Sequence, residues 1–202
     1  MSTTTLNPNK KRLVIIFALF LIPLLIAAIW YILLPDDYKP GKTTNNGNLI
    51  QPIYPVQAFE QQTKEGASFS GKDLEKKWTL VHLVNGNCDE ACSKWLYHTR
   101  QIRIALAEDM DRVNRLAVVD TAQAATGNAK MWESHPDMQV IVGGEGGLGK
   151  QIRTHTAEQK YPENSVFLID PLGNLMMQFP PDLDPKKLMK DLEKLLKLSR
   201  IG

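Results

Sequence analysis

The chain has 202 residues, of which 43% are hydrophobic and 23% are charged, with 24 Lys and Arg against 22 Asp and Glu. This composition excludes a disordered chain and a collagen-like fibre, and a formal charge of +2 gives no field that argues for nucleic acid. Two cysteines are too few for a disulfide scaffold, so any chemistry that they carry is local.

The first expected element is a transmembrane helix over residues 13–34, a run that contains no charged residue. A helix of this length spans a hydrocarbon core of about 30 Å. Basic residues precede the run and Asp36 and Asp37 follow it, so the positive-inside rule predicts a cytoplasmic N-terminus over residues 1–12. The protein is then a single-pass protein of the inner (plasma) membrane with a periplasmic C-terminal domain, an oxidising compartment for cysteines. The alternative is a cleaved signal peptide, whose apolar region is shorter.

The exported part divides into a linker and one domain. Residues 35–52 are rich in Pro, Gly, Asn and Thr, a composition typical of a flexible linker. Residues 53–202 are long enough to bury a single core. The domain is expected to begin with a hairpin in which Val56–Phe59 and Ala67–Ser70 flank a turn at Glu65-Gly66.

The remaining pattern predicts an α/β fold with a mostly parallel central sheet. Buried strands are expected at residues 78–85, 115–121, 139–143 and 166–170, and a turn after Asp170 leads into a last strand at residues 174–179. Apolar residues at helical spacing predict helices over residues 89–110 and 185–200.

The two cysteines lie in Cys88-Asp-Glu-Ala-Cys92, directly after an expected strand and at the start of an expected helix. The positive end of the helix dipole and its unpaired N–H groups favour a thiolate over a thiol. Cys92 lies one turn further on, so the pair can close a disulfide or offer two sulfur ligands to Cu(I). The alternative is a fixed structural disulfide or two buried thiols. The strand-to-helix position favours a redox or metal role, because functional side chains concentrate in such loops.

This layout resembles thioredoxin-like proteins and, within them, the Sco/SenC family of cytochrome oxidase assembly factors. The resemblance covers about residues 53–198, and it rests on FEQQTKEGASFSGKDL leading into KKWTLVHLVN, on the spaced pair Cys88 and Cys92, and on SVFLIDPLGNLMMQF. It implies a thioredoxin-like fold, a central mixed sheet flanked by helices, behind the N-terminal transmembrane helix.

One position departs from that family. Sco proteins complete a copper site with a histidine just before the strand that resembles VFLID, and Pro162 occupies that position here. A proline there is similar to the cis-proline that lies beside the cysteines of thioredoxins. We therefore expect a cis Tyr161–Pro162 bond against the cysteine pair. Among the histidines, His155 is the candidate substitute copper ligand, because it lies in a loop leading toward Pro162.

The resemblance implies a thiol–disulfide redox protein that assists assembly of the copper centre of cytochrome c oxidase. Its partner is expected to be an oxidase subunit or another copper or thiol assembly factor, with Cys88 as the attacking thiolate and Cys92 as the resolving thiol. The alternatives are a Cu(I) metallochaperone that uses Cys88, Cys92 and His155, and a non-catalytic assembly scaffold with a structural disulfide. No nucleotide is expected, because Gln151 stands where a phosphate loop has Ser or Thr after the run at residues 144–150.

Overall fold

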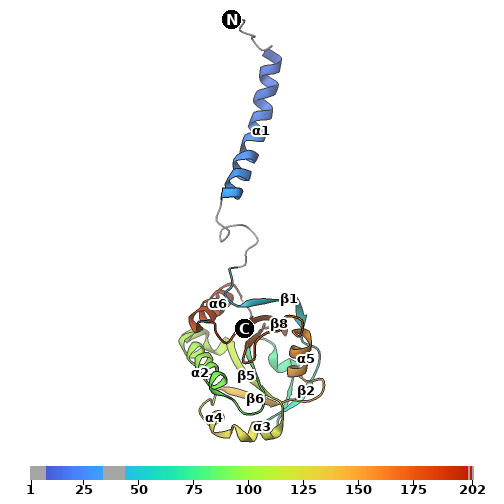
Figure 1. The fold of residues 1–202 in the computed structure, drawn as a ribbon, viewed down its shortest axis with the longest axis vertical. Coiled ribbons are helices and arrows are strands. Elements are labelled where there is room, and N and C mark those ends of the chain that lie inside the picture. The colour runs from blue at the N-terminus through green and yellow to red at the C-terminus, as the bar shows by residue number, and fades with distance from the viewer. Residues whose placement is uncertain (1–7, 34–43, 200, 202) are drawn as a thin grey trace. The chain divides into compact units, whose positions relative to one another are not determined.

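The structure is a computed structural model that describes residues 8–33, 44–199 and 201. The chain divides into two compact units, Met1–Thr44 and Asn45–Gly202. The described part of the first unit is dominated by α1 (Pro8–Leu33), which includes Pro23 (Figure 1). By length and composition α1 is able to cross a membrane, and no other helix in the described residues is. The expected apolar N-terminal helix is thus confirmed. Residues 1–7 and 34–43, which include much of the expected N-terminus, the last residue of the expected transmembrane helix and the first half of the expected linker, lie outside the described residues.

The second unit is built on an eight-stranded mixed sheet with the strand order β1-β8-β7-β4-β5-β6-β2-β3. The strands are β1 (Asn48–Pro55), β2 (Glu60–Thr63), β3 (Ser68–Ser70), β4 (Trp78–Val84), β5 (Val113–Val119), β6 (Met138–Val142), β7 (Val166–Ile169) and β8 (Asn174–Phe179). Only β4, β5 and β6 are parallel to one another, and every other neighbouring pair is antiparallel. The thioredoxin-like mixed sheet is confirmed, and the expectation of a mostly parallel sheet is wrong.

Two expected boundaries shift at the start of the domain. Residues 48–52, assigned to the linker, belong to β1, which pairs with the sheet edge at β8. The expected hairpin exists, but its first strand is β2 rather than Val56–Phe59. Gly66 has a φ of 87°, a left-handed conformation that glycine adopts without steric cost, and it closes the turn between the two strands. The polar residues of β2 gave no apolar pattern from which to place it.

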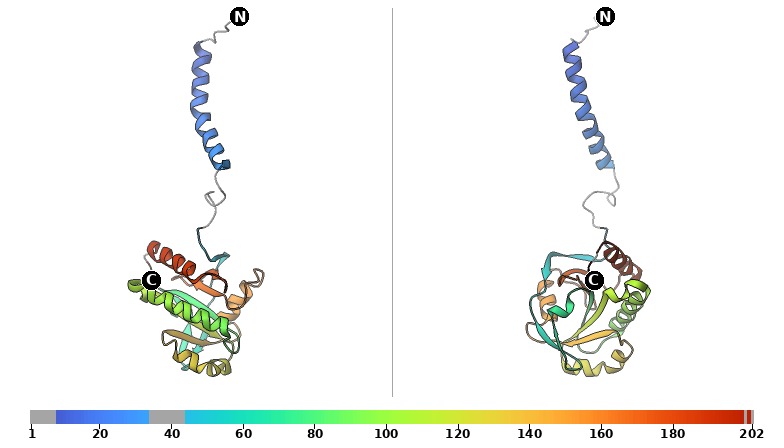
Figure 2. Two further views of the ribbon diagram at one scale, coloured as in Figure 1. Left: turned by 60° about the vertical axis from the view of Figure 1, so that its left-hand side comes forward. Right: turned by 180° about the vertical axis from the view of Figure 1, so that it is seen from behind.

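Helices cover both faces of the sheet. They are α2 (Glu90–Ala105), α3 (Ala122–Gly127), α4 (Ala129–Glu133), α5 (Leu148–His155) and α6 (Pro185–Leu198), with 3₁₀ turns η2 (Gly71–Leu74) and η3 (Ala107–Arg112). Figure 2 shows α2 and α6 side by side, and they contact each other. The apolar residues of α6 share a core with Trp78 and Leu80 of β4, while α5 shares a separate core with Val81.

This arrangement explains the nearly continuous apolar run of β4. Successive side chains of a strand point to opposite faces, and here both faces are covered by packed elements. Val84, at the end of β4, packs in a third core with Cys92 of α2 and Ala124 of α3. The carboxyl end of β4 is therefore anchored beside the cysteine motif, and this positions the motif at one edge of the sheet.

Candidate redox site

Cys88 and Cys92 form a disulfide, with Cα atoms 5.4 Å apart. Cys88 lies in the loop between β4 and α2, and Cys92 lies in the first turn of α2. The local sequence explains this geometry, because Asp89 is the N-cap of α2 and its Oδ1 accepts a hydrogen bond from the Cys92 N–H at 2.7 Å. The cap fixes where the helix begins, and so brings the second sulfur one turn from the first.

The two cysteines differ in their exposure. Cys92 is only 7% exposed and packs among Val84, Leu96 and Ala117. Cys88 is partly exposed and contacts the edge of the same core. Of the two cysteines, Cys88 is therefore the more accessible to an incoming thiol or disulfide. This difference agrees with attack at Cys88 and resolution by Cys92.

Asn128, which sequence reasoning missed, holds the loop that carries Cys88. Its Oδ1 accepts a hydrogen bond from the Cys88 N–H at 3.1 Å, and its Nδ2 donates to Gly86 O at 3.0 Å and to Ala124 O at 2.7 Å. Asn128 is 8% exposed. The side chain thus ties the Cys88 loop to the end of α3 with buried hydrogen bonds. Its partner Cys88 lies forty residues away in the sequence, so no local pattern marks it.

A second loop reaches the cysteine motif from the other side. Asn164 Nδ2 lies 3.3 Å from Asp89 Oδ1 and donates to that carboxylate. A pocket of about 260 Å³ opens beside this contact, and Asn85, Arg153, Tyr161 and Pro162 are among the residues that line it. The hollow offers room for a segment of another molecule beside the loop that contacts Asp89 of the cysteine motif.

A buried polar network lies beneath α2. Arg115 of β5 is fully buried, and its guanidinium donates to Thr99 Oγ1 and Leu96 O of α2. The same guanidinium donates two hydrogen bonds to Asp137, at 3.0 and 2.9 Å. His82 Nε2 lies 3.1 Å from Thr99 Oγ1. These contacts fix α2, and the disulfide at its start, against the sheet.

Burial sets the protonation state of this network. Burial, together with the positive charge of Arg115, holds the pKa of His82 well below its usual value, so this imidazole is neutral. The pKa of His135 is lowered for the same two reasons. Burial opposes the ionisation of Asp137, but its hydrogen bonds to Arg115 outweigh that effect and leave the pKa of Asp137 below its usual value. His82 is a core residue on the face of β4 that packs against α2.

The expectation of a cis Tyr161–Pro162 bond is wrong. Among the described residues the cis peptide bond is at Gln51–Pro52. The loop around Pro162 is instead turned by Lys160 and Asn164, both with positive φ, and by Ser165, whose Oγ donates to Pro162 O at 2.6 Å. Pro162 is exposed at the rim of the pocket, and the residue of this loop that touches the cysteine motif is Asn164.

The expected grouping of His155 with the cysteines is also wrong. His155 ends α5, which packs on the face of the sheet opposite α2, and its ring stacks on Tyr54 with centroids 4.3 Å apart. Its Nε2 lies 3.1 Å from Pro52 O. The described residues contain no group of three or more His, Cys, Asp or Glu placed to hold a metal ion. Cys88 and Cys92 thus offer two sulfur ligands without a third protein ligand at the site.

Similar solved structures share this fold. The Arabidopsis thaliana ScoI with copper bound is 17% identical, with a TM-score of 0.55, over 72% of this chain and 99% of that one. BsSco, described as a member of the Sco family of cytochrome c oxidase assembly proteins with a disulfide switch, is 14% identical, with a TM-score of 0.54, over 78% of this chain and 100% of that one. The thioredoxin domain of a thiol-disulfide oxidoreductase from Bacteroides vulgatus is 15% identical, with a TM-score of 0.52, over 76% and 99% of the two chains. The resemblance to Sco/SenC proteins is confirmed for the fold.

No curated protein sequence matches this chain. Residues 78–199, from β4 to the end of α6, match the family model described as "Transmembrane-like, thioredoxin-like, C-terminal domain". The match includes both cysteines, Asn128 and the buried network beneath α2. With more than half of its length matched, the chain belongs to this family of thioredoxin-like domains.

Proposed function

We propose that this protein is a membrane-anchored, extracytoplasmic thiol–disulfide redox protein that assists assembly of the copper centre of cytochrome c oxidase. The observation that carries the proposal is the Cys88–Cys92 disulfide at the start of α2, with one sulfur partly exposed and the other buried. A pair in this position of a thioredoxin-like domain is accessible to another thiol or disulfide.

The exchange that we propose begins with the reduced pair. The Cys88 thiolate attacks one sulfur of a partner disulfide, a mixed disulfide forms, and the partner's second sulfur leaves as a thiolate. The Cys92 thiolate then attacks Cys88 Sγ, which releases the partner as a dithiol and restores the Cys88–Cys92 disulfide. Two electrons pass to the partner in each cycle. A dithiol protein has to supply them again by the same exchange in reverse.

Three observations support the compartment and the partner. The apolar helix α1 is long enough to span a bilayer, and Lys10, Lys11 and Arg12 at its start favour a cytoplasmic N-terminus. Under this proposal the span is residues 13–34, and the domain from residue 45 lies in the periplasm, where disulfides persist. The shared fold with ScoI and BsSco favours a cysteine-bearing oxidase subunit, or an assembly factor for it, as the partner.

A Cu(I) metallochaperone is the second candidate function, favoured by the paired sulfurs. Two thiolates one helical turn apart suit a soft ion once the disulfide is reduced. His155 is not part of this site, and the described residues offer no third ligand in its place. The residues present therefore do not complete the three-ligand site that Sco proteins use. Thiol–disulfide exchange requires only the two sulfurs that the structure brings together.

Trapping of the mixed disulfide tests the proposal. In membranes that contain the respiratory chain, the Cys92→Ser variant should accumulate a thiol-reducible adduct with a copper-site subunit or assembly factor, because no resolving thiol remains. Cys88→Ser is the matched control and should form no adduct. Equal adducts from both variants, or none from either, would contradict the proposed exchange. Stoichiometric Cu(I) binding by the reduced chain, lost in both variants and without any adduct, would favour the metallochaperone.

A further inference from the structure

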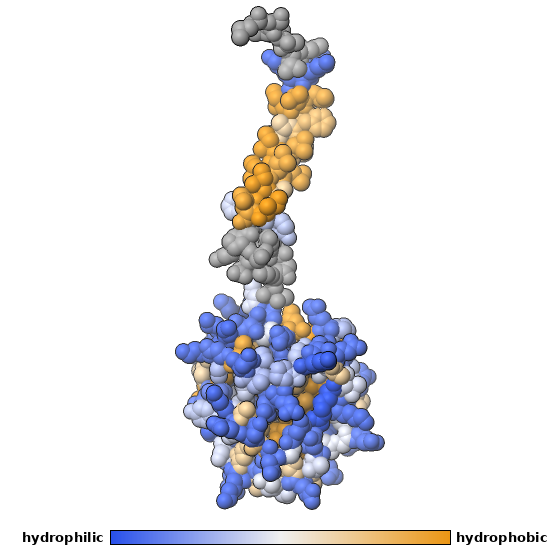
Figure 3. Space-filling model, in the orientation of Figure 1, coloured by the Kyte–Doolittle hydropathy of each residue, from blue (hydrophilic) through white to orange (hydrophobic). Residues whose placement is uncertain are grey.

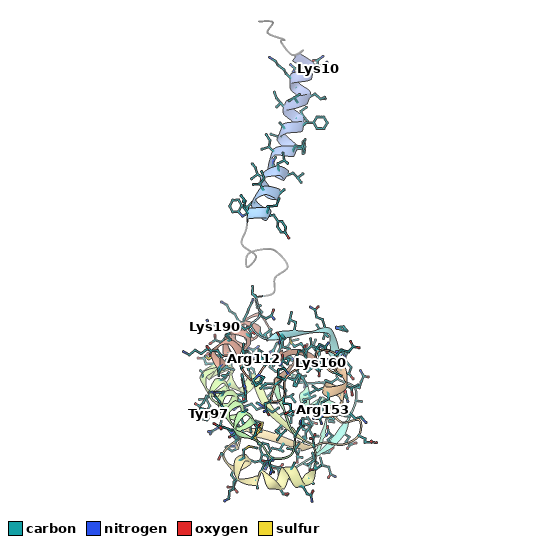
Figure 4. The ribbon with its side chains drawn as sticks, in the orientation of Figure 1. Lys10, Tyr97, Arg112, Arg153, Lys160 and Lys190 are labelled. Atoms are coloured by element: carbon teal, nitrogen blue, oxygen red, sulfur yellow. A yellow bond between two sulfur atoms is a disulfide. The ribbon has the colours of Figure 1, made fainter. Side chains whose placement is uncertain are left out.

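The outer face of α6 carries a patch of positive charge. Its exposed residues include five lysines against one glutamate, Glu193, and we call this patch the lysine surface: Lys186, Lys187, Lys190, Lys194 and Lys197. The opposite face is apolar and is buried in the core through Leu188, Leu192 and Leu196. Figure 4 labels Lys190 on α6, and the domain surface around this helix is largely hydrophilic in Figure 3.

The domain is tied to α6 at the point where its chain begins. Asp191, 4% exposed, accepts hydrogen bonds from the N–H groups of Asn46 at 2.8 Å and Gly47 at 2.9 Å. It also accepts one from Asn46 Nδ2 at 2.7 Å. The segment that leads to α1 therefore leaves the domain beside α6. Twelve residues separate Leu33, the end of α1, from Asn46. Even a fully extended chain of this length keeps Asn46 within about 45 Å of Leu33.

The end of α6 adds exposed apolar side chains to the positive charge. Leu198 is 73% exposed and Ile201 is 50% exposed, next to Lys197. Lysines together with exposed apolar residues are the combination that binds the interface of an anionic bilayer. Each lysine near such a surface adds a modest attraction, and a short tether raises the effective concentration of lipid around the patch.

We propose that the lysine surface of α6 docks on the anionic phospholipid headgroups of the leaflet next to the domain. This inference rests on the membrane anchor of the proposed function. An acidic protein partner would fit the charge, but the hydrogen bonds between Asn46 and Asp191 put the patch beside the residues through which the domain is tethered. If α1 spans the membrane, an anionic bilayer is the charged surface that is always within reach of the tethered domain.

Docking through α6 leaves the disulfide free. Cys88 is held by Asn128, between α3 and α4, and Figure 1 shows these two helices at the end of the domain opposite α6. The contacts of Asp191 involve none of the residues that surround the disulfide. Lipid binding by α6 would therefore orient the domain and present the partly exposed Cys88 to a partner rather than to the membrane.

Carbene footprinting of the full chain in lipid nanodiscs tests this inference. One set of discs contains phosphatidylcholine alone, and the other contains phosphatidylcholine and phosphatidylglycerol in equal parts. An uncharged diazirine is photolysed, and labelling of residues 186–198 is compared with labelling around Lys72 and Lys130, exposed lysines elsewhere on the domain. We expect labelling of the α6 segment to fall by about threefold or more in the anionic discs, and to recover at high salt.

Charge-reversal variants separate docking from an unrelated effect of lipid. K187E/K190E should lose the protection, whereas the matched control K72E/K130E, with the same change in net charge, should keep it. Both variants need unchanged circular dichroism. Equal labelling in the two kinds of disc, protection that survives K187E/K190E, or protection that appears only on adding an acidic protein would overturn the inference. Release of the chain from both kinds of disc by an alkaline wash would instead overturn the membrane anchor itself.

Discussion

Asn128 illustrates how one side chain can determine the behaviour of a redox pair. It accepts from the Cys88 N–H and donates to Gly86 O, on either side of the exposed Asn87, so the loop before α2 is held in a single position. A sulfur held in place has a high effective concentration toward its neighbour. The hydrogen bonds of Asn128 should therefore favour closure of the disulfide.

The Asn128→Ala variant tests this role. Removing the side chain leaves the Cys88 N–H and Gly86 O without a protein partner, and we expect the free energy of unfolding to fall by about 1–3 kcal/mol. We also expect the Cys88–Cys92 pair to become easier to reduce, by about 30 mV for each tenfold loss of effective concentration. Thiol-trapping titrations in glutathione or dithiothreitol buffers measure this shift. Thr126→Ala, a change at an exposed residue of α3 two positions before Asn128, is the control. A lower stability with an unchanged potential would limit Asn128 to a structural role.

At this scale the sequence predicts the cysteine pair well and its surroundings poorly. Cys88 and Cys92 are neighbours in the chain, so a local pattern is enough to bring them together. Asn128 and Asn164 reach the motif only through the tertiary fold. His155 was misplaced for the same reason, because sequence distance from the cysteines says nothing about which face of the sheet α5 covers.

At the scale of elements, α2 is held against the sheet by a polar network as well as by apolar packing. Arg115 bridges from β5 to the carbonyl of Leu96, to Thr99 and to Asp137. A buried guanidinium of this kind is tolerated because its charge is paired and its N–H groups are satisfied. The neutral state of His82 is part of the same arrangement.

This network makes stability depend on pH. The pKa of His82 is lowered in the folded state, so the unfolded chain takes up a proton below about pH 6.5 while the folded domain does not. Its contribution to stability is complete above that pH and is lost as the pH falls, by up to about 1.4 kcal/mol per pH unit. His135 acts in the same direction.

Denaturant unfolding at about pH 7.5 and about pH 5.5 measures this dependence. The wild-type chain should be less stable at the lower pH, and His82→Leu should flatten the slope. His98→Gln, on the partly exposed side of α2, serves as the control and should keep it. A slope that is the same in wild type and His82→Leu would exclude His82 as its source.

Buried strands and long amphipathic helices were predictable, and short helices were not. The strands β4, β5, β7 and β8 and the helices α2 and α6 lie within a few residues of the sequence-based expectation, because each has an extended apolar pattern. The helices α3, α4 and α5 were missed, since each has eight residues or fewer. Helix periodicity needs a longer window to be visible.

At the scale of the whole molecule, the domain has its own complete core. Both faces of its sheet are covered by elements of residues 45–202, and the three core clusters that the described residues form lie within residues 49–196. A chain that begins at residue 45 should therefore remain soluble without detergent. It should also unfold at the same denaturant midpoint as the full chain in neutral-lipid nanodiscs. Sedimentation and tryptophan fluorescence provide the two measurements, and aggregation of the shortened chain would show that the domain depends on its N-terminal segment.

The reduction potential of the Cys88–Cys92 pair tests the central claim most directly. The full chain is equilibrated in a series of dithiol–disulfide buffers, free thiols are alkylated, and the reduced fraction is read by mass. We expect a reversible two-electron transition between about −270 and −120 mV, the range of proteins that exchange disulfides with partners. A reduction potential below about −300 mV would identify the Cys88–Cys92 disulfide as a structural bond, and the redox function proposed here would be wrong.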